Sequence, residues 1–117
     1  MEGKANELID KITDFISSDK YEVDGLVGML KDLRPLAIEE EDPMVTRIIR
    51  QMFEHLEEHQ SFQVTAMTEE DEEGELFLLE PGEDKENLLY VMELIKKSQN
   101  EVNREELRMM GEALKEF

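Results

Sequence analysis

The sequence predicts a mostly helical α+β domain, with about five helices and a two-stranded β-hairpin between the third and the fourth. In five segments, the apolar residues recur at the spacing of three and four that places them on one face of a helix. Residues 61–80 instead begin with alternating apolar and polar residues. Because 117 residues match the usual size of one domain, we expect a single core within a single domain, 1–117.

The first two predicted helices are amphipathic. Residues 6–17 carry the apolar stripe Leu8, Ile9, Ile12, Phe15 and Ile16. Asp24 is a suitable N-cap for the second helix, whose stripe is Leu26, Val27, Leu30 and Leu33. We expect this helix to end at Arg34 and Pro35, because the residue before a proline disfavours the helical conformation.

The third helix has the clearest signals. Asp42 is placed to cap it, Pro43 occupies its first position, and the pattern continues to about His59. Its apolar stripe is the longest in the chain. We therefore expect the middle of the core to consist of Val45, Ile48, Ile49, Met52, Phe53 and Leu56.

Residues 61–80 admit two interpretations. Phe62, Val64 and Ala66 alternate with polar residues, and a short apolar run follows at 76–79, which favours a β-hairpin. The alternative is a short helix capped by Thr68, which Gly74 would weaken. A lone hairpin is marginally stable in water, so either the helices or another chain must support it.

Two more helices are predicted after Pro81 and Gly82. One covers about 84–98 and the other begins at Asn103, with Glu106 completing a capping-box-like start. In the fourth helix, Tyr90 and Leu94 lie outside the main stripe, one turn apart, so this helix has two apolar faces. We expect Tyr90 and Leu94 to form an interaction surface, unless the hairpin covers them within the same chain.

The net charge of −18 is far outside the usual magnitude of about 2–8 for a small domain. Half of it lies between residues 68 and 86, where ten acidic residues and one lysine give −9. Such a charge disfavours direct binding to nucleic acid. Leu, Ile, Val and Phe still make up 32 of the 117 residues, which predicts a folded chain. No apolar stretch is long enough to span a membrane and no signal-peptide pattern is present, so we expect a cytoplasmic protein.

Two motifs resemble metal sites. His55, Glu58 and His59 match H-x-x-E-H, in which two histidines one helical turn apart bind zinc. Residues 69–80 place oxygen ligands at positions 1, 3, 5 and 12 of a calcium loop and Gly74 at position 6. The zinc-peptidase motif needs a further carboxylate ligand far downstream and a large substrate cleft, but only 58 residues follow His59. The calcium motif lacks its flanking helices. We therefore expect partly exposed histidines at a helix end, a solvated acidic hairpin tip, and no metal or other cofactor.

No pattern for nucleophilic catalysis or phosphate binding occurs, and the chain has no cysteine. We therefore expect a non-enzymatic protein-interaction or regulatory domain that binds a protein partner, with homodimer formation left open. An alternative is an acidic mimic of nucleic acid that occupies the basic groove of a DNA- or RNA-binding protein. A third class, a metal-dependent hydrolase using His55 and His59, would need a further ligand brought to them by the fold.

Overall fold

The computed structural model describes residues 1–117 and confirms the predicted class. Its elements are α1 (Gly3–Ser17), α2 (Val23–Glu39), α3 (Pro43–His59), β1 (Thr68–Glu70), β2 (Leu76–Leu78), α4 (Asp84–Lys96) and α5 (Glu101–Glu116). The two strands form one antiparallel sheet between α3 and α4, so the hairpin interpretation of this region is confirmed. None of the helices is long and apolar enough to cross a membrane.

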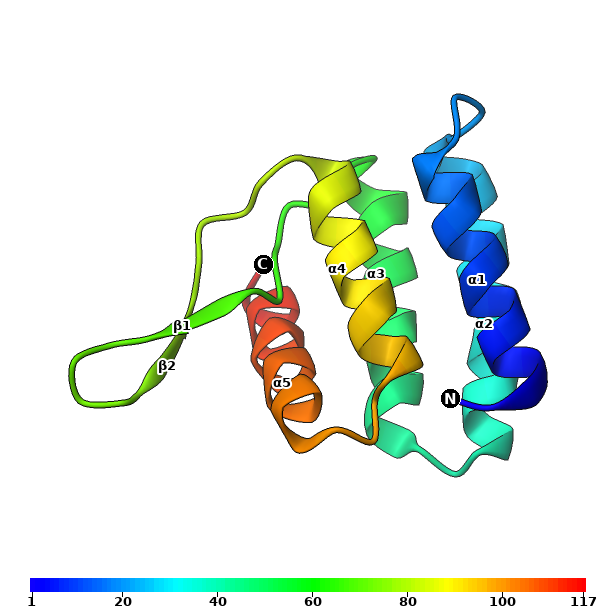
Figure 1. Cartoon of the computed structure of the whole chain (residues 1–117). Coiled ribbons are helices and arrows are strands. Elements are labelled where there is room, and N and C mark those ends of the chain that lie inside the picture. The colour runs from blue at the N-terminus through cyan, green and yellow to red at the C-terminus, as the bar shows by residue number, and fades with distance from the viewer.

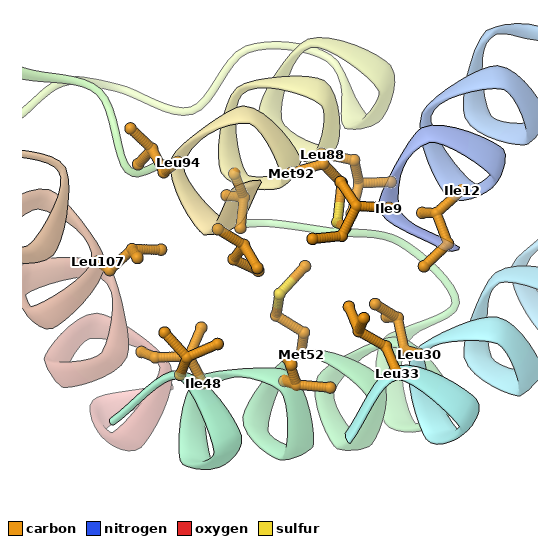
Figure 2. Packing of buried hydrophobic residues seen from close by; sticks show 14 of the residues in the cluster. Ile9, Ile12, Leu30, Leu33, Ile48, Met52, Leu88, Met92, Leu94 and Leu107 are labelled. Carbon is orange, nitrogen blue, oxygen red and sulfur yellow. The ribbon is translucent and has the colours of Figure 1, made fainter. Parts of the chain in front are cut away.

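The five helices form a closed ring around the core (Figure 1). Helix α1 packs against α2 and α4, α2 packs against α3, and α5 closes the ring between α3 and α4. Each helix therefore turns one apolar stripe towards the same interior. Side chains from all five helices meet there (Figure 2), with Met52 of α3 among those drawn at the centre. The hairpin lies outside this ring (Figure 1).

The stripe of α3 forms the middle of the core, as predicted, with the exception of Phe53. Val45, Ile48, Ile49, Met52 and Leu56 are fully buried, whereas Phe53 is half-buried at the edge. At ~100° per residue, Phe53 lies ~80° from the centre of the other five, on the flank facing α2. The Lys31 ammonium of α2 lies there, 5.4 Å from the ring centre. The prediction that Phe53 lies in the middle of the core was therefore wrong, although its side chain packs against the core from this edge.

The second helix continues past its predicted end. Pro35 lies inside α2, which ends at Glu39 and not at Arg34. A proline within a helix removes one backbone donor. That loss is offset here because the following turn packs onto the core, where Ala37 is fully buried. The backbone N–H of Glu40 then donates to the carbonyl of Leu36 at the C-terminus of the helix.

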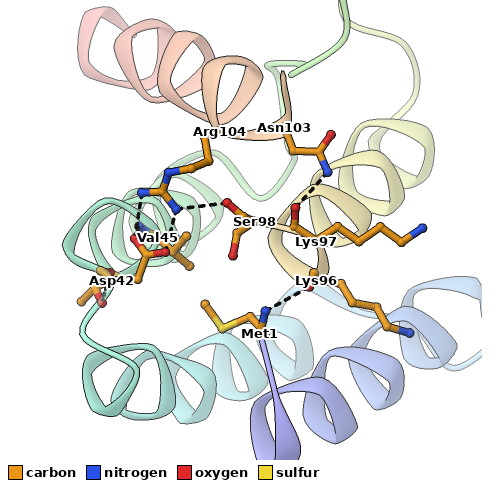
Figure 3. Close-up of polar contacts among 9 residues, drawn as sticks. Met1, Asp42, Val45, Lys96, Lys97, Ser98, Asn103 and Arg104 are labelled. Atoms are coloured by element: carbon orange, nitrogen blue, oxygen red, sulfur yellow. Dashed lines mark hydrogen bonds and ion pairs between the residues drawn. The ribbon is translucent and has the colours of Figure 1, made fainter. Parts of the chain in front are cut away.

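Asp42 caps α3 as predicted, and it also joins α3 to the first turn of α5 through Arg104 (Figure 3). Its carboxylate accepts from the Val45 N–H at 3.2 Å and from both Arg104 guanidinium NH2 groups at 2.8 and 3.2 Å. Arg104 also donates to the Ser98 carbonyl at 3.0 Å. Partial burial raises the pKa of Asp42, but the hydrogen bonds from Arg104 and Val45 together hold this pKa below its ordinary value.

The predicted start of the last helix was wrong by two residues. Helix α5 begins at Glu101 because Asn100, not Asn103, is its N-cap, and the Asn100 side chain accepts from the N–H groups of Val102 and Asn103. Helix α4 ends at Lys96, two residues before the predicted boundary. Glu106, expected to complete a capping box with Asn103, is buried and bonded to other elements.

We predict that Gly111→Ala destabilises the protein although alanine is the better helix former. A methyl group at Gly111 on α5 would lie 2.7 Å from Cδ1 of the fully buried Ile48 on α3. Overpacking at such a contact costs about 1–3 kcal/mol, which exceeds the gain of about 1 kcal/mol in helix propensity. Urea denaturation measures the difference in the free energy of unfolding between Gly111→Ala and the wild type.

The matched control is Gly28→Ala. Gly28 lies inside α2 with nothing within 4 Å of the position that a methyl group would take. This substitution should stabilise the protein by about 0.5–1 kcal/mol. Equal stabilisation by both substitutions would mean that α3 and α5 are not in close contact at Gly111.

Candidate interaction site

Residues 69–80, which we call the acidic hairpin, project from the helical ring next to α5 (Figure 1). The strands are antiparallel, with Thr68 opposite Leu78 and Glu69 opposite Phe77. The pairing extends beyond β2, because the Leu79 N–H donates to the Met67 carbonyl at 2.9 Å. A hairpin of this size exposes most of its side chains to solvent.

The tip of the acidic hairpin is held by Asp71. The carboxylate oxygen Oδ1 of Asp71 accepts from the N–H groups of Glu73 at 2.8 Å and Glu75 at 2.9 Å. Gly74 completes the turn with a φ of +83°, which favours glycine over other residues. The segment that matches a calcium loop thus forms a tight turn between strands, and Asp71 binds the backbone of its own turn.

The two faces of the acidic hairpin differ. Thr68, Leu76 and Leu78 are half-buried, whereas Glu69 and Phe77, which are cross-strand partners, are exposed on the other face. Phe77 keeps 44% of its surface accessible. The outward face therefore presents an aromatic ring beside a carboxylate.

The charge of the acidic hairpin is not neutralised within the chain. Residues 69–80 contain seven acidic and no basic residues, and all seven acidic residues are exposed. None of the ion pairs in the molecule includes one of these carboxylates. Their electrostatic field is consequently directed to solvent and to whatever approaches from it.

The buried Glu106 of α5 fixes the base of the hairpin. Its Oε2 accepts from the backbone N–H of Thr68 at 3.0 Å and from the Thr68 hydroxyl at 2.7 Å, while its Oε1 accepts from the Tyr90 hydroxyl at 2.6 Å. Only 5% of Glu106 is exposed. Burial, the hydrogen bond to Glu106 and the charge of Glu106 raise the pKa of Tyr90 to about 12.

Asn87 of α4 joins the segments that precede and follow the hairpin. Its side-chain NH2 donates to the carbonyls of Phe62 at 2.9 Å and Gly82 at 3.1 Å, and its side-chain oxygen accepts from the Gly82 N–H at 2.9 Å. The amide of Asn87 is almost fully buried, so these bonds are shielded from water. Both ends of the hairpin are thereby attached to the helical ring.

The predicted interaction surface at Tyr90 and Leu94 is mostly covered by the chain itself. Leu94 is buried, with 4% of its surface exposed, and belongs to the core cluster. Tyr90 is half-buried and its hydroxyl is bonded to Glu106, next to Thr68 of β1. Helix α4 does have two apolar faces, as predicted, but the second one packs within the protein.

His55 and His59 lie at the end of α3, where Phe117 covers them, with its ring centre 4.7 Å from that of each histidine. His59 is partly exposed, as expected, but His55 is buried, with 6% of its surface accessible. The expectation of two partly exposed histidines was therefore wrong for His55, because Phe62 and Phe117 pack against it. No group of three or more His, Asp or Glu side chains in the chain is placed to hold a metal ion.

Comparisons with protein families, with curated proteins and with solved structures find no match for this chain.

Sequence reasoning missed the two residues that anchor the hairpin. Glu106 occurs one turn before Met110 on the apolar stripe of α5, a position at which a charged residue signals a buried partner. Asn87 gives a similar signal beside Leu88. Neither signal identifies the partner, because Thr68 and Phe62 are far away in sequence.

We predict that Tyr90→Phe destabilises the protein by about 1–2 kcal/mol at neutral pH, because Glu106 loses a donor. The unfolded tyrosine ionises near its ordinary pKa of 10.0 and the folded one near 12. Between these values the unfolded state binds fewer protons, so the stability of the wild type falls as the pH rises. The difference in the free energy of unfolding between the wild type and Tyr90→Phe, measured by urea denaturation, should therefore shrink between these two pH values.

Tyr21→Phe is the control for this prediction. The Tyr21 hydroxyl is buried without a hydrogen-bond partner, so its removal should change the stability at neutral pH by less than about 0.5 kcal/mol. Equal losses in the two variants would show that the bond between Tyr90 and Glu106 contributes nothing.

Proposed function

We propose that this protein is a non-enzymatic interaction domain whose acidic hairpin binds a basic, arginine-containing segment of a partner protein. The observation that carries the proposal is the pairing of exposed Phe77 with exposed Glu69 on the outward face of the hairpin. Anchoring by Glu106 and Asn87 supports it, because a surface that is ordered before binding loses less entropy when the partner docks.

An arginine side chain fits this face in two ways. Its planar guanidinium can stack on the ring of Phe77, and its paired N–H groups can donate to a carboxylate such as Glu69. A lysine ammonium is a compact point charge, so it gains less from the pairing of ring and carboxylate. The proposal therefore favours arginine over lysine in the partner.

The remaining carboxylates supply attraction over a longer range. The concentration of −9 between residues 68 and 86 raises the rate at which basic partners approach and repels acidic ones. Two copies of this chain would repel each other through the same surface. The partner is accordingly a different, basic protein.

The other two candidate functions have less support. Mimicry of nucleic acid needs carboxylates spaced along a rigid stripe, whereas the densest charge here lies in a short hairpin. A hydrolase at His55 and His59 would need a third ligand, and the fold brings none to them.

We predict that neutralising four carboxylates of the hairpin weakens binding of an arginine-rich peptide by about tenfold or more at low salt, because these charges attract the peptide. The variant combines Glu69→Gln, Glu70→Gln, Glu72→Gln and Glu73→Gln. Asp71 is left unchanged because its carboxylate holds the turn. Calorimetry or fluorescence anisotropy measures the dissociation constant.

The control removes the same charge from the helical ring. It combines Glu7→Gln, Asp14→Asn, Glu112→Gln and Glu116→Gln, all exposed residues outside the ion pairs. We expect a loss of less than about threefold, because these charges are not at the docking site. Equal losses in the two variants would show that only net charge matters and would contradict the proposed site.

The aromatic ring gives a separate prediction. Phe77→Leu keeps an apolar side chain but removes the ring, so the preference for an arginine-rich peptide over a lysine-rich peptide of equal length should fall by about two- to fivefold. The affinity for the lysine peptide should change little. An unchanged preference would exclude stacking on Phe77.

A further inference from the structure

Residues 60–67, which we call the first arm, connect the end of α3 to β1 and lead into the hairpin. At its start, the Gln60 N–H donates to the Leu56 carbonyl at the end of α3 at 2.9 Å. The next attachment to α3 is a hydrogen bond from the backbone N–H of Gln63 to the ring nitrogen Nε2 of His55 at 3.2 Å. A ring nitrogen that accepts a hydrogen bond carries no proton. The bond therefore requires a neutral His55, with its proton on Nδ1.

The surroundings of His55 are mostly apolar and aromatic. The ring centres of Phe62 and Phe117 lie 5.6 and 4.7 Å away, and that of His59 lies 4.6 Å away. Phe62 itself is fully buried. A positive charge on His55 would thus be removed from water and would face a second imidazole.

The charged groups around His55 come from three helices, and some favour its protonation while others oppose it. Helix α3 contributes Glu58, Glu54 and Arg50 besides His59, helix α5 contributes Lys115, and the start of α4 contributes Asp84. The acidic groups favour a protonated His55, whereas His59 and the basic groups oppose it. No carboxylate is paired with the His55 ring.

We infer that His55 is a proton-controlled anchor, which holds the first arm at Gln63 when neutral and releases the arm there when protonated. Protonation puts a second N–H on the ring, so that Nε2–H would face the Gln63 N–H and the hydrogen bond would be lost. The charged ring would then seek solvent, and the arm with Phe62 covers it from solvent. Neutral and charged His55 thus favour two different positions of this arm.

The direction of the pH effect follows from the same contacts. Burial lowers the pKa of His55 from its ordinary value of 6.5, and the nearby His59 lowers it further, against the opposing charges of Glu58 and Asp84. The state with the arm detached then binds more protons than the folded state as the pH falls below 6.5. Attachment of the arm is complete above this pH and weakens below it.

Release is confined to the part of the arm around Gln63, because the other anchors do not titrate in this range. Asn87 has no ionisable group, and it still binds the Phe62 and Gly82 carbonyls. If the proposed function is correct, on which this consequence rests, acidification would loosen the support of the acidic hairpin and weaken its hold on a basic partner. The inference about His55 itself does not depend on any partner.

Hydrogen exchange of the Gln63 amide tests the inference in the protein alone. Between about pH 7.5 and pH 5.5, the protection factor should fall in the wild type by up to about tenfold, since each pH unit below 6.5 favours the detached state by at most about tenfold. In His55→Gln, whose side-chain oxygen accepts a hydrogen bond but does not titrate, the fall should be less than about twofold. His59→Gln is the control and should keep the pH dependence.

An NMR titration of the wild-type imidazoles keeps the test valid if a variant does not fold. We expect the His55 resonance to titrate below 6.5 and the Gln63 amide resonance to move with it. Two results would overturn the inference: His55 titrating at 6.5 or above, or a Gln63 protection factor that is independent of pH in the wild type. Neither measurement involves a basic peptide. Failure of the inference about His55 is therefore distinguishable from failure of the proposed function.

Discussion

The buried carboxylate of Glu106 is the contact on which the position of the hairpin depends. From α5 it binds Thr68 of β1 and Tyr90 of α4, so three elements meet at one side chain. Removing a carboxylate from water costs several kcal/mol, which is offset here because donors reach both oxygens. A carboxylate with three donors also has a fixed orientation. A hairpin of two three-residue strands, marginal by itself, thereby acquires a defined direction.

The fold separates apolar burial from charge. The closed ring of helices contains the core, and its exposed charges include both signs, as in the pairs of Lys31 with Glu57 and Lys96 with Asp10. The acidic hairpin carries no basic residue and lies outside the ring (Figure 1). Self-repulsion among its carboxylates thus acts on a segment that contributes little to the core. The chain can concentrate negative charge there at a small cost in stability.

The helices could be predicted because their signals are local, whereas the anchors of the hairpin depend on contacts between distant residues. Asp42 followed by Pro43 marks the start of α3 whatever packs against it. Pro35 stayed within α2 because packing of the next turn outweighs the lost hydrogen bond, and this packing is set by other helices. Leu94 was expected on a contact surface because periodicity shows that a second apolar face exists, but not what covers it. The partner of Glu106 could not be read from sequence for the same reason.

Two of the hydrogen bonds that attach the hairpin depend on pH, one weakening in acid and the other in base. The His55 bond to Gln63 requires a neutral imidazole and weakens as the pH falls below 6.5, whereas the Tyr90 bond to Glu106 requires a protonated phenol and weakens as the pH rises from 10.0 to about 12. Asn87 is insensitive to both changes. All three attachments are complete only between these limits. Physiological pH lies closer to the lower limit than to the upper one, so the bond between His55 and Gln63 is the attachment that a physiological change of pH affects first.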